Sequence, residues 1–125
     1  MNIEDIRDFC ISLPHTTEGF PFGDDYLVFK VLGKIFLITN LNKIPMSISV
    51  KCNPNWAVKL REEYTEITAG YHLNKKHWNT IEAEFLPNDF VIKMIKHSYN
   101  EVINKLPKKL KINKLPKKLK INKLT

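Results

Sequence analysis

The spacing of apolar residues predicts a helix near the start of the chain and a longer helix near its end. In residues 2–14, NIEDIRDFCISLP, the apolar positions fall on one helical stripe, made of Ile3, Ile6, Cys10 and Leu13. Asn2 is suited to cap this helix, and Glu4 and Asp5 follow in the first turn, where the helix dipole favours negative charge. Residues 86–106 carry a second stripe, made of Phe90, Val91, Met94, Ile95, Ser98, Val102 and Leu106.

Between these helices the apolar pattern changes to the alternation that is typical of strands. A loop comes first, rich in Pro14, Gly19, Pro21 and Gly23. Residues 25–40 then form two β-rich runs that divide at Gly33-Lys34, which is a hairpin signal. Residues 46–52, MSISVKC, alternate apolar with polar positions and predict a third strand.

A short helix and a second hairpin follow the third strand. In residues 53–64, Asn53 is placed to cap a helix and Pro54 takes its first position. The apolar residues of this helix recur at four-residue spacing, as Trp56, Leu60 and Tyr64. Residues 70–81, GYHLNKKHWNTI, alternate as the two arms of a hairpin around a polar tip at 74–76. The predicted order is helix, three strands, helix, two strands, helix, which is an α+β fold with an antiparallel sheet covered by helices.

Length and composition favour a single domain. The chain has 125 residues, of which 43% are hydrophobic, and we expect one core within residues 1–106. No apolar run approaches the roughly 18 residues of a membrane span, and the acidic start lacks the pattern of a signal peptide. We therefore expect a cytoplasmic monomer without membrane contact. Cys10 and Cys52 have neither a metal-binding nor a disulfide spacing, and we expect both to be buried thiols.

Charge is distributed unevenly along the chain. The formal net charge is +7, but residues 1–105 hold 12 Lys and Arg against 13 Asp and Glu, a net of −1. Within that part, residues 1–25 carry a net of −5 and residues 26–81 carry a net of +5. An anion-binding surface on the folded domain must therefore come from the middle segment.

The C-terminal end is a basic duplication. NKLPKKLKI fills residues 104–112 and is then repeated, and residues 106–125 hold 8 Lys without an acidic residue. Pro107 and Pro116 each disfavour helix in the residue before them. We expect residues 107–125 to form a mobile cationic extension that attracts polyanions without sequence preference.

The stretch GYHLNKKHWNT, residues 70–80, concentrates the candidate chemistry of the chain. A metal site needs three or four converging ligands, whereas only His72 and His77 are close here and no carboxylate or thiolate stands at a ligand spacing. A catalytic site needs a nucleophile, a base and an orienting group, and no known signature supports Thr80 with His77 in those roles. We therefore predict no metal, no cofactor and no enzymatic activity. Packing of Trp78 beside a solvated turn explains the tryptophan but not the lysines.

Four blocks of the sequence stand out as a set: IEDIRDFCISLPHTTEGFPFGDDYLVFKVLGKIF, ISVKCNP, GYHLNKKHWNTI and HSYNEVINKLP. Together they resemble the MmcQ/YjbR family of small bacterial proteins over nearly the whole domain. The third block is the most specific, because G-Y-H, N-K and H-W-N-T in one register are improbable by chance. The resemblance implies a frataxin-like (CyaY-like) α+β fold and DNA binding through a double wing, formed by two projecting β-hairpins or loops. The second nine-residue copy at the C-terminus goes beyond the family pattern.

The predicted hairpins and the charge of the middle segment agree with such a role. Hairpin tips are narrow enough to enter a groove or straddle phosphates, and Lys34 on one tip with Lys75 and Lys76 on the other would make two cationic prongs. Phosphate contacts position a protein, whereas contacts with base edges read the sequence, and His72, Asn74, His77 and Asn79 are the residues expected to touch base edges. The predicted partner is DNA. The predicted nucleic-acid-binding residues are Lys34, His72, Asn74, Lys75, Lys76, His77 and Asn79.

Two other functions stay open at the level of sequence. A small-molecule or enzymatic pocket would use a histidine as general acid-base within the cluster Tyr71, His72, His77, Trp78 and Asn79. A frataxin-like cation site would use the acidic residues near the start, Glu4, Asp5, Asp8, Glu18, Asp24 and Asp25. A deep pocket lined by the first cluster would favour the first alternative, whereas protruding solvated tips would favour DNA binding.

Overall fold

The chain folds around one antiparallel sheet of six strands. The computed structural model describes residues 1–70 and 73–107. The strands lie in the order β1-β2-β3-β4-β6-β5. Their bounds are β1 Thr16–Gly19, β2 Tyr26–Val31, β3 Lys34–Asn40, β4 Ile48–Lys51, β5 Ile67–Ala69 and β6 Trp78–Ile81. The helices are α1 Ile3–Ser12, α2 Pro54–Glu63, the short 3-10 helix η1 Ala83–Phe85, and α3 Asn88–Asn104.

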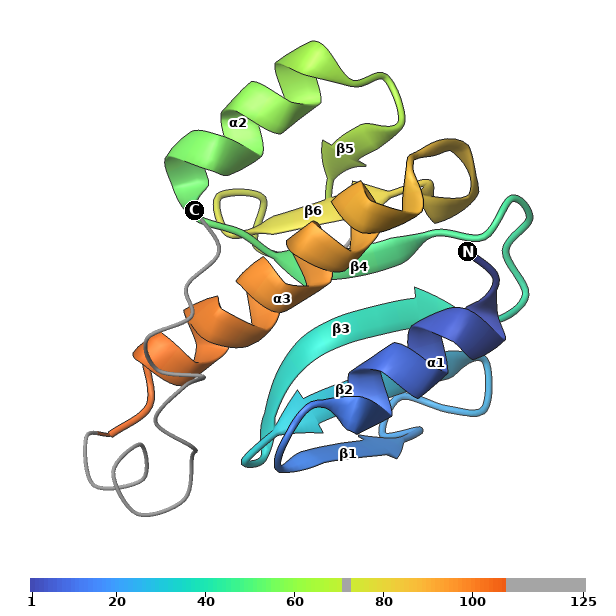
Figure 1. Ribbon diagram of the computed structural model, residues 1–125, viewed down its shortest axis with the longest axis vertical. Helices are drawn as coiled ribbons and strands as arrows, with labels where there is room; N and C mark the ends of the chain where they lie inside the picture. The colour runs from blue at the N-terminus through green and yellow to red at the C-terminus, as the bar shows by residue number, and fades with distance from the viewer. Residues whose placement is uncertain (71–72, 108–125) are drawn as a thin grey trace.

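The three α-helices cover one face of the sheet and leave the other face without a helix (Figure 1). Helix α3 crosses β3 and β4, α1 packs beside β1, and α2 packs on β5 and β6. The predicted α+β class with an antiparallel sheet is therefore confirmed. Among residues 1–70 and 73–107, no helix combines the length and the apolar character that a membrane crossing requires.

Strand β1 was not predicted from the sequence. The stretch from Thr16 to Gly19, expected to be loop, pairs with β2 from Thr16↔Val31 to Gly19↔Val28. Because β1 lies at the edge of the sheet, both of its faces tolerate polar residues and it lacks the apolar alternation of a buried strand. The hairpin between β2 and β3 is present, but its turn is Leu32-Gly33, one residue earlier than expected. Both turn residues have positive φ, 48° and 83°, as a tight two-residue hairpin turn requires.

The predicted helix caps are confirmed. The Asn2 side chain accepts a hydrogen bond from the Asp5 backbone N–H, and the Asp5 carboxylate accepts one from the Asn2 backbone N–H, which completes a capping box for α1. Asn53 caps α2 by accepting from the backbone N–H groups of Asn55 and Trp56. Both helices therefore begin where a polar side chain satisfies their first amide groups.

The core lies between the helices and the sheet. Phe36 of β3 meets Tyr99 of α3 edge to face, with ring centroids 5.4 Å apart, and the Tyr99 hydroxyl donates to the carbonyl oxygen of Pro14 at 2.6 Å. Cys10 and Cys52 are buried as expected, and burial raises the pKa of each thiol to about 12. Both cysteines therefore stay protonated near neutral pH.

A short ladder joins the two halves of the sheet. Strands β3 and β4 share the register pairs Leu37↔Val50 and Ile38↔Ser49, whereas β4 and β6 share four pairs and β2 and β3 share six. Beyond Leu37 the ladder is replaced by the Ser98 hydroxyl of α3, which donates to the Phe36 carbonyl oxygen at 2.5 Å and accepts from the Lys51 backbone N–H at 2.8 Å. The side chain of a helix thus connects two strands that have separated.

A second hydroxyl closes the opposite end of the same ladder. Thr39 Oγ1 donates to the carbonyl oxygen of Ser47 at 2.8 Å, and the Thr39 side chain is buried. The β3–β4 joint therefore consists of two ladder pairs with a side-chain hydroxyl at each end. Because Ser98 is fully buried, its two backbone partners have no water to replace it.

We predict that Ser98→Ala lowers the free energy of unfolding by about 1–3 kcal/mol, because it leaves the buried Phe36 carbonyl and the partly buried Lys51 N–H without their partner. Urea unfolding followed by circular dichroism measures the change. Ser12→Ala is the matched control, since the Ser12 hydroxyl also donates to a carbonyl oxygen, that of Phe9, but on the exposed surface of α1. Equal effects of the two substitutions would contradict the role given to Ser98.

Candidate nucleic-acid interface

The residues that precede β6 form a compact turn. The Asn74 carbonyl oxygen accepts from the backbone N–H groups of His77 and Trp78 at 3.2 and 3.0 Å, and Asn74 Oδ1 accepts from the Lys76 N–H at 2.9 Å. Asn74, Lys75 and Lys76 are all exposed, so the predicted polar tip is at the surface. Tyr71 and His72, the other members of the predicted site in this stretch, lie outside the described residues.

Residues from two other elements hold this turn in place. Arg61 Nη1 of α2 donates to the Lys75 carbonyl oxygen and to Asn79 Oδ1, both at 2.9 Å. The Cys52 N–H, directly after β4, donates to the His77 carbonyl oxygen at 2.7 Å. The two lysines are thus presented by a backbone that is bound from both sides.

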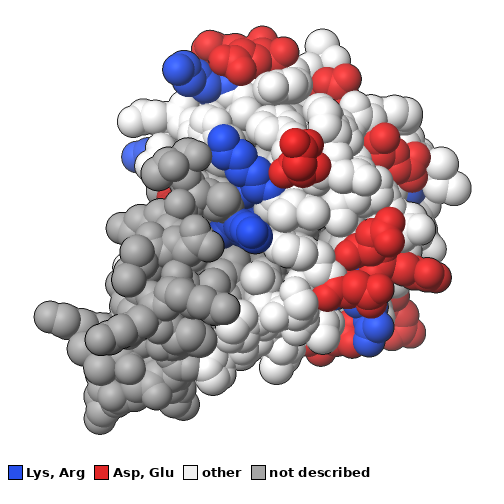
Figure 2. Space-filling model, in the orientation of Figure 1, with Lys and Arg blue, Asp and Glu red and all other residues white. Residues whose placement is uncertain are grey.

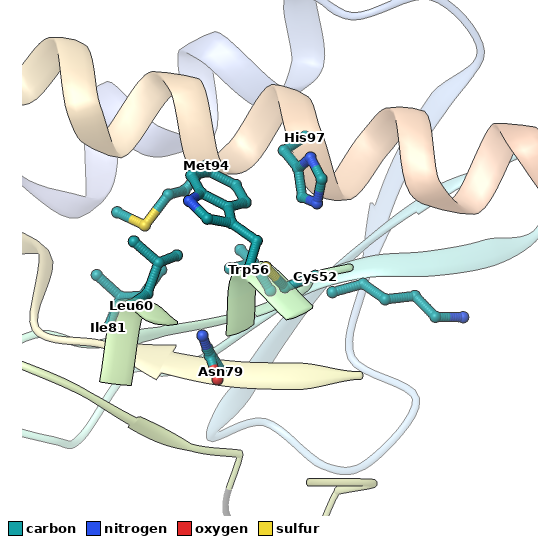
Figure 3. A pocket seen from close by; sticks show the side chains of 9 residues that line it. Cys52, Trp56, Leu60, Asn79, Ile81, Met94 and His97 are labelled. Carbon is teal, nitrogen blue, oxygen red and sulfur yellow. The ribbon is translucent and has the colours of Figure 1, made fainter. Parts of the chain in front are cut away.

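Asn79 lies in the interior and does not belong to the exposed interface. Its side chain is 1% exposed, Oδ1 accepts from Arg61, and Nδ2 donates to the Ala57 carbonyl oxygen at 3.3 Å. Figure 3 shows the Asn79 side chain rising from β6 toward the residues of α2 and α3. The expectation that Asn79 touches a base edge is therefore wrong, because every second residue of β6 faces the helices. Asn79 supports the turn indirectly, because it binds the Arg61 guanidinium that also donates to the Lys75 carbonyl oxygen.

Five lysines from four elements occupy one end of the sheet. Lys51 ends β4, Lys75 and Lys76 lie in the turn before β6, and Lys105 follows the last turn of α3. Lys34 begins β3 at the same end, because β3 and β4 are antiparallel. We define the basic end as Lys34, Lys51, Lys75, Lys76, His77 and Lys105.

The charges of the basic end repel one another. Partial burial lowers the pKa of His77, and the positive charges of Lys105, Lys51 and Lys76 lower it further, while the negative charge of Glu101 opposes them. Burial also lowers the pKa of Lys51, with a further contribution from Lys105. Cations from β4, from the turn and from α3 are therefore close enough to disfavour each other's charge, which a bound anion would relieve.

One acidic residue, Glu101, acts on the basic end, whereas others belong to α1 or lie beside it. On the helix-covered face, Asp and Glu cluster over α1 and around it, whereas Lys and Arg lie toward the centre and the opposite side, with acidic residues beside some of them (Figure 2). Arg7 is the cation of the acidic side, and its guanidinium forms a two-point ion pair with Glu18 of β1, with the shorter N···O distance at 2.5 Å. This pair lowers the pKa of Glu18.

His97 of α3 is a structural residue that contacts the start of α2. Its Nε2 accepts from the Asn53 N–H at 3.0 Å, and its ring meets that of Trp56 edge to face at 4.6 Å (Figure 3). Burial lowers the pKa of His97, which favours the neutral acceptor that the Asn53 N–H needs. The signal in the sequence was its three-residue spacing from Met94, on the edge of the apolar stripe.

The two alternative sites are not assembled by the described residues. Trp78 and Asn79 are consecutive in β6 and point to opposite faces of the sheet, so they do not line one pocket. Trp56, Leu60, Met94 and His97 fill the space above Asn79 without leaving a cavity (Figure 3). Across residues 1–70 and 73–107, no three His, Cys, Asp or Glu side chains converge as a metal site would require, and this includes the acidic residues of α1.

Fold and site together define a small α+β protein in which cations gather at one end of an antiparallel sheet. A family model described as YjbR matches residues 11–101, and the chain belongs to this family. It is 32% identical over 108 residues to the uncharacterized protein YbdF of Escherichia coli O157:H7, with 85% of this chain and 88% of that protein covered. It is 24% identical over 110 residues to the uncharacterized protein YjbR of Escherichia coli strain K12, covering 87% and 93%.

Two solved structures are similar to this fold over most of the chain. Protein DR2400 of Deinococcus radiodurans superposes with a TM-score of 0.83 at 36% identity, covering 89% of this chain and 86% of that one. A protein from Pseudomonas syringae superposes with a TM-score of 0.67 at 25% identity, covering 78% and 96%. The family resemblance noted from the sequence is thus confirmed, while the likeness to frataxin stays a prediction.

We predict that Arg61→Met lowers the free energy of unfolding by about 1–3 kcal/mol, because the buried Asn79 oxygen loses its charged donor. The same change should speed amide hydrogen exchange at His77 and Trp78, since the Lys75 carbonyl is released as well. Lys59→Met, on an exposed position of α2, is the control and should change neither quantity. Unaltered exchange in Arg61→Met would show that the turn does not depend on α2.

Proposed function

We propose that this protein binds nucleic acid, with DNA as the partner, by placing phosphates on the basic end. The observation that supports this most directly is the mutual repulsion of cations from three elements around His77. A bound anion would offset this repulsion, and a polyanion offers several charges at the spacing of a backbone. The proposal includes a single chain acting in the cytoplasm, where nucleic acid is accessible.

The shape of the basic end suits a phosphate backbone. The β2–β3 hairpin carries Lys34 and the turn before β6 carries Lys75 and Lys76, so the two proposed wings lie on different halves of the sheet. Lys51 at the end of β4 and Lys105 after α3 add charge near one another. Because the turn is held by Arg61 and Cys52, little conformational freedom is lost on binding.

The duplicated segment adds to this attraction through charge alone. The described chain ends at residue 107, two residues after Lys105 of the basic end, and residues 108–125 contain 8 Lys and no acid. Lysines near the main site release counterions from nucleic acid without contacting bases. The segment should therefore raise affinity for every sequence to the same extent.

Sequence preference should be weak. Asn79 is buried, and Asn74 uses its side-chain oxygen to hold the Lys76 N–H, so two of the predicted base readers are already engaged. His77 is the described reader that keeps partial exposure. The groups at the surface are mainly point charges, which position a backbone but do not distinguish bases.

We predict that Lys75→Glu with Lys76→Glu weakens binding of the full-length chain to a random duplex and flattens its salt dependence. Loss of about two phosphate contacts removes roughly 1.8 from the slope of log affinity against log salt, and the reversed charges add repulsion. Fluorescence anisotropy at several salt concentrations measures both effects. Stability should change by no more than about 0.5 kcal/mol, because the two side chains are exposed.

Lys59→Glu on α2 is the control for net charge. It reverses one charge, as each substitution of the double variant does, but at an exposed position outside the basic end. If binding depended on total charge alone, Lys59→Glu would produce half the loss of the double variant. Binding of the double variant that matches the parent at every salt concentration would end the proposal.

We also predict that duplex affinity rises as the pH falls from about 8 to about 5.5, the range in which histidine gains its proton. In the free protein, partial burial and the charges of Lys105, Lys51 and Lys76 hold the pKa of His77 down. A nearby phosphate favours the protonated form, so binding takes up a proton and is strengthened at lower pH. His77→Gln should flatten this dependence, whereas an equally steep profile in His77→Gln would place the histidine away from the phosphates.

A further inference from the structure

The face of the sheet without helices carries a groove of about 660 Å³. Strands β3, β4 and β6 form its floor. The floor residues are Ile38 and Asn40 of β3, Ser47 just before β4, Ser49 of β4 and Thr80 of β6. Tyr26 of β2 and Leu73 stand at its sides, and Phe22 and Lys43 come from the loops before β2 and after β3. A volume of this size lies within the range of roughly 300–1,000 Å³ that is usual for small-molecule and cofactor pockets.

The lining combines exposed aromatic rings with uncharged hydrogen-bonding groups. Phe22 and Tyr26 are 59% and 40% exposed, which is high for rings of that size. The Ser49 and Thr80 hydroxyls share one hydrogen bond at 2.9 Å, so one of the two hydrogens is left to donate elsewhere. Lys43 is the cation of the lining.

The same face leads from the groove to the basic end. Ser49 and Lys51 are alternate residues of β4 and share this face, and the register pairs Ser49 with Thr80 and Lys51 with Trp78. Trp78 is partly exposed beside Lys51. A ligand that begins in the groove and continues along β4 therefore passes from aromatic and hydroxyl groups to positive charge.

We infer that the groove holds an unpaired nucleobase of the strand whose phosphates lie on the basic end, so that single-stranded nucleic acid is the preferred ligand. This rests on the function proposed for the basic end. Aromatic platforms that stack bases, beside cations that follow the backbone, are the two components of single-strand binding. A duplex keeps its bases stacked and paired, so only its phosphates would reach this surface.

The neighbouring acidic residue does not oppose this ligand strongly. Asp25 precedes Tyr26, and its carboxylate accepts a hydrogen bond from Asn42 Nδ2 at 2.7 Å. A base placed in the groove is uncharged, and the next phosphate along β4 lies toward Lys51. The order of groups along β4 therefore matches the order of base and phosphate along a strand.

The test compares a mixed-sequence single strand with a duplex of the same length, both titrated with the full-length chain at raised salt, which weakens phosphate contacts more than stacking. The parent should hold the single strand more tightly. Phe22→Ser with Tyr26→Ser should lower single-strand affinity on the order of 5- to 100-fold, while duplex affinity stays the same. Phe22→Ser alone removes a loop side chain and covers the case in which Tyr26→Ser disturbs β2.

Phe85→Ser is the matched control, since Phe85 is 58% exposed but lies in η1, outside the groove lining. If the aromatic variants bound both ligands as the parent does, or lost both equally, the inference would be overturned. In that case duplex binding by Lys75→Glu with Lys76→Glu, titrated in parallel, tests the proposed function separately, which predicts weaker binding. If the full-length chain binds neither the single strand nor the duplex, both the inference and the proposed function are overturned. A change of sedimentation in the aromatic variants without a change in binding assigns the groove to a second copy of the chain and also overturns the inference.

Discussion

The arrangement of the molecule depends on the Ser98 hydroxyl, which links β3 and β4 at the point where their backbone pairing stops. Strands β3 and β4 share two register pairs, and α3 supplies the next connection by placing one oxygen between the Phe36 carbonyl and the Lys51 N–H. A buried serine in the middle of an apolar helical stripe is therefore part of the sheet's hydrogen bonding. Because Lys51 belongs to the basic end, this interaction also determines where its cations stand relative to those of β3.

The basic end combines a firmly held backbone with exposed cationic side chains. The turn before β6 is bound by Arg61 and by the Cys52 N–H, while its two lysines point to solvent. On the opposite side, the acidic charge of Glu18 is neutralised by Arg7. Charge is thus paired at Glu18, whereas at the basic end three lysines act on His77 against one acidic residue, Glu101. This contrast, more than the net charge, distinguishes the proposed interface from an ordinary solvated surface.

Much of the fold could be predicted because local signals agreed with tertiary packing. The stripe of α3, the cap at Asn2 and the Asn53-Pro54 start of α2 each have one local physical cause. Strand β1 could not be predicted, since an edge strand needs no apolar alternation. In the candidate site, the exposed turn was visible in the sequence, whereas the burial of Asn79 depends on Arg61, 18 residues away. The groove could not be found either, because its lining is drawn from separate strands and loops.

The two open edges of the sheet affect the tendency of the protein to aggregate at high concentration. An unpaired strand offers its free N–H and C=O groups to any extended chain, and long edges therefore promote self-association into fibres. Here the edge strands β1 and β5 are 4 and 3 residues long, and β1 carries the charged Glu18. Edges this short give an incoming strand little to pair with, so the protein should resist β-aggregation even at high concentration.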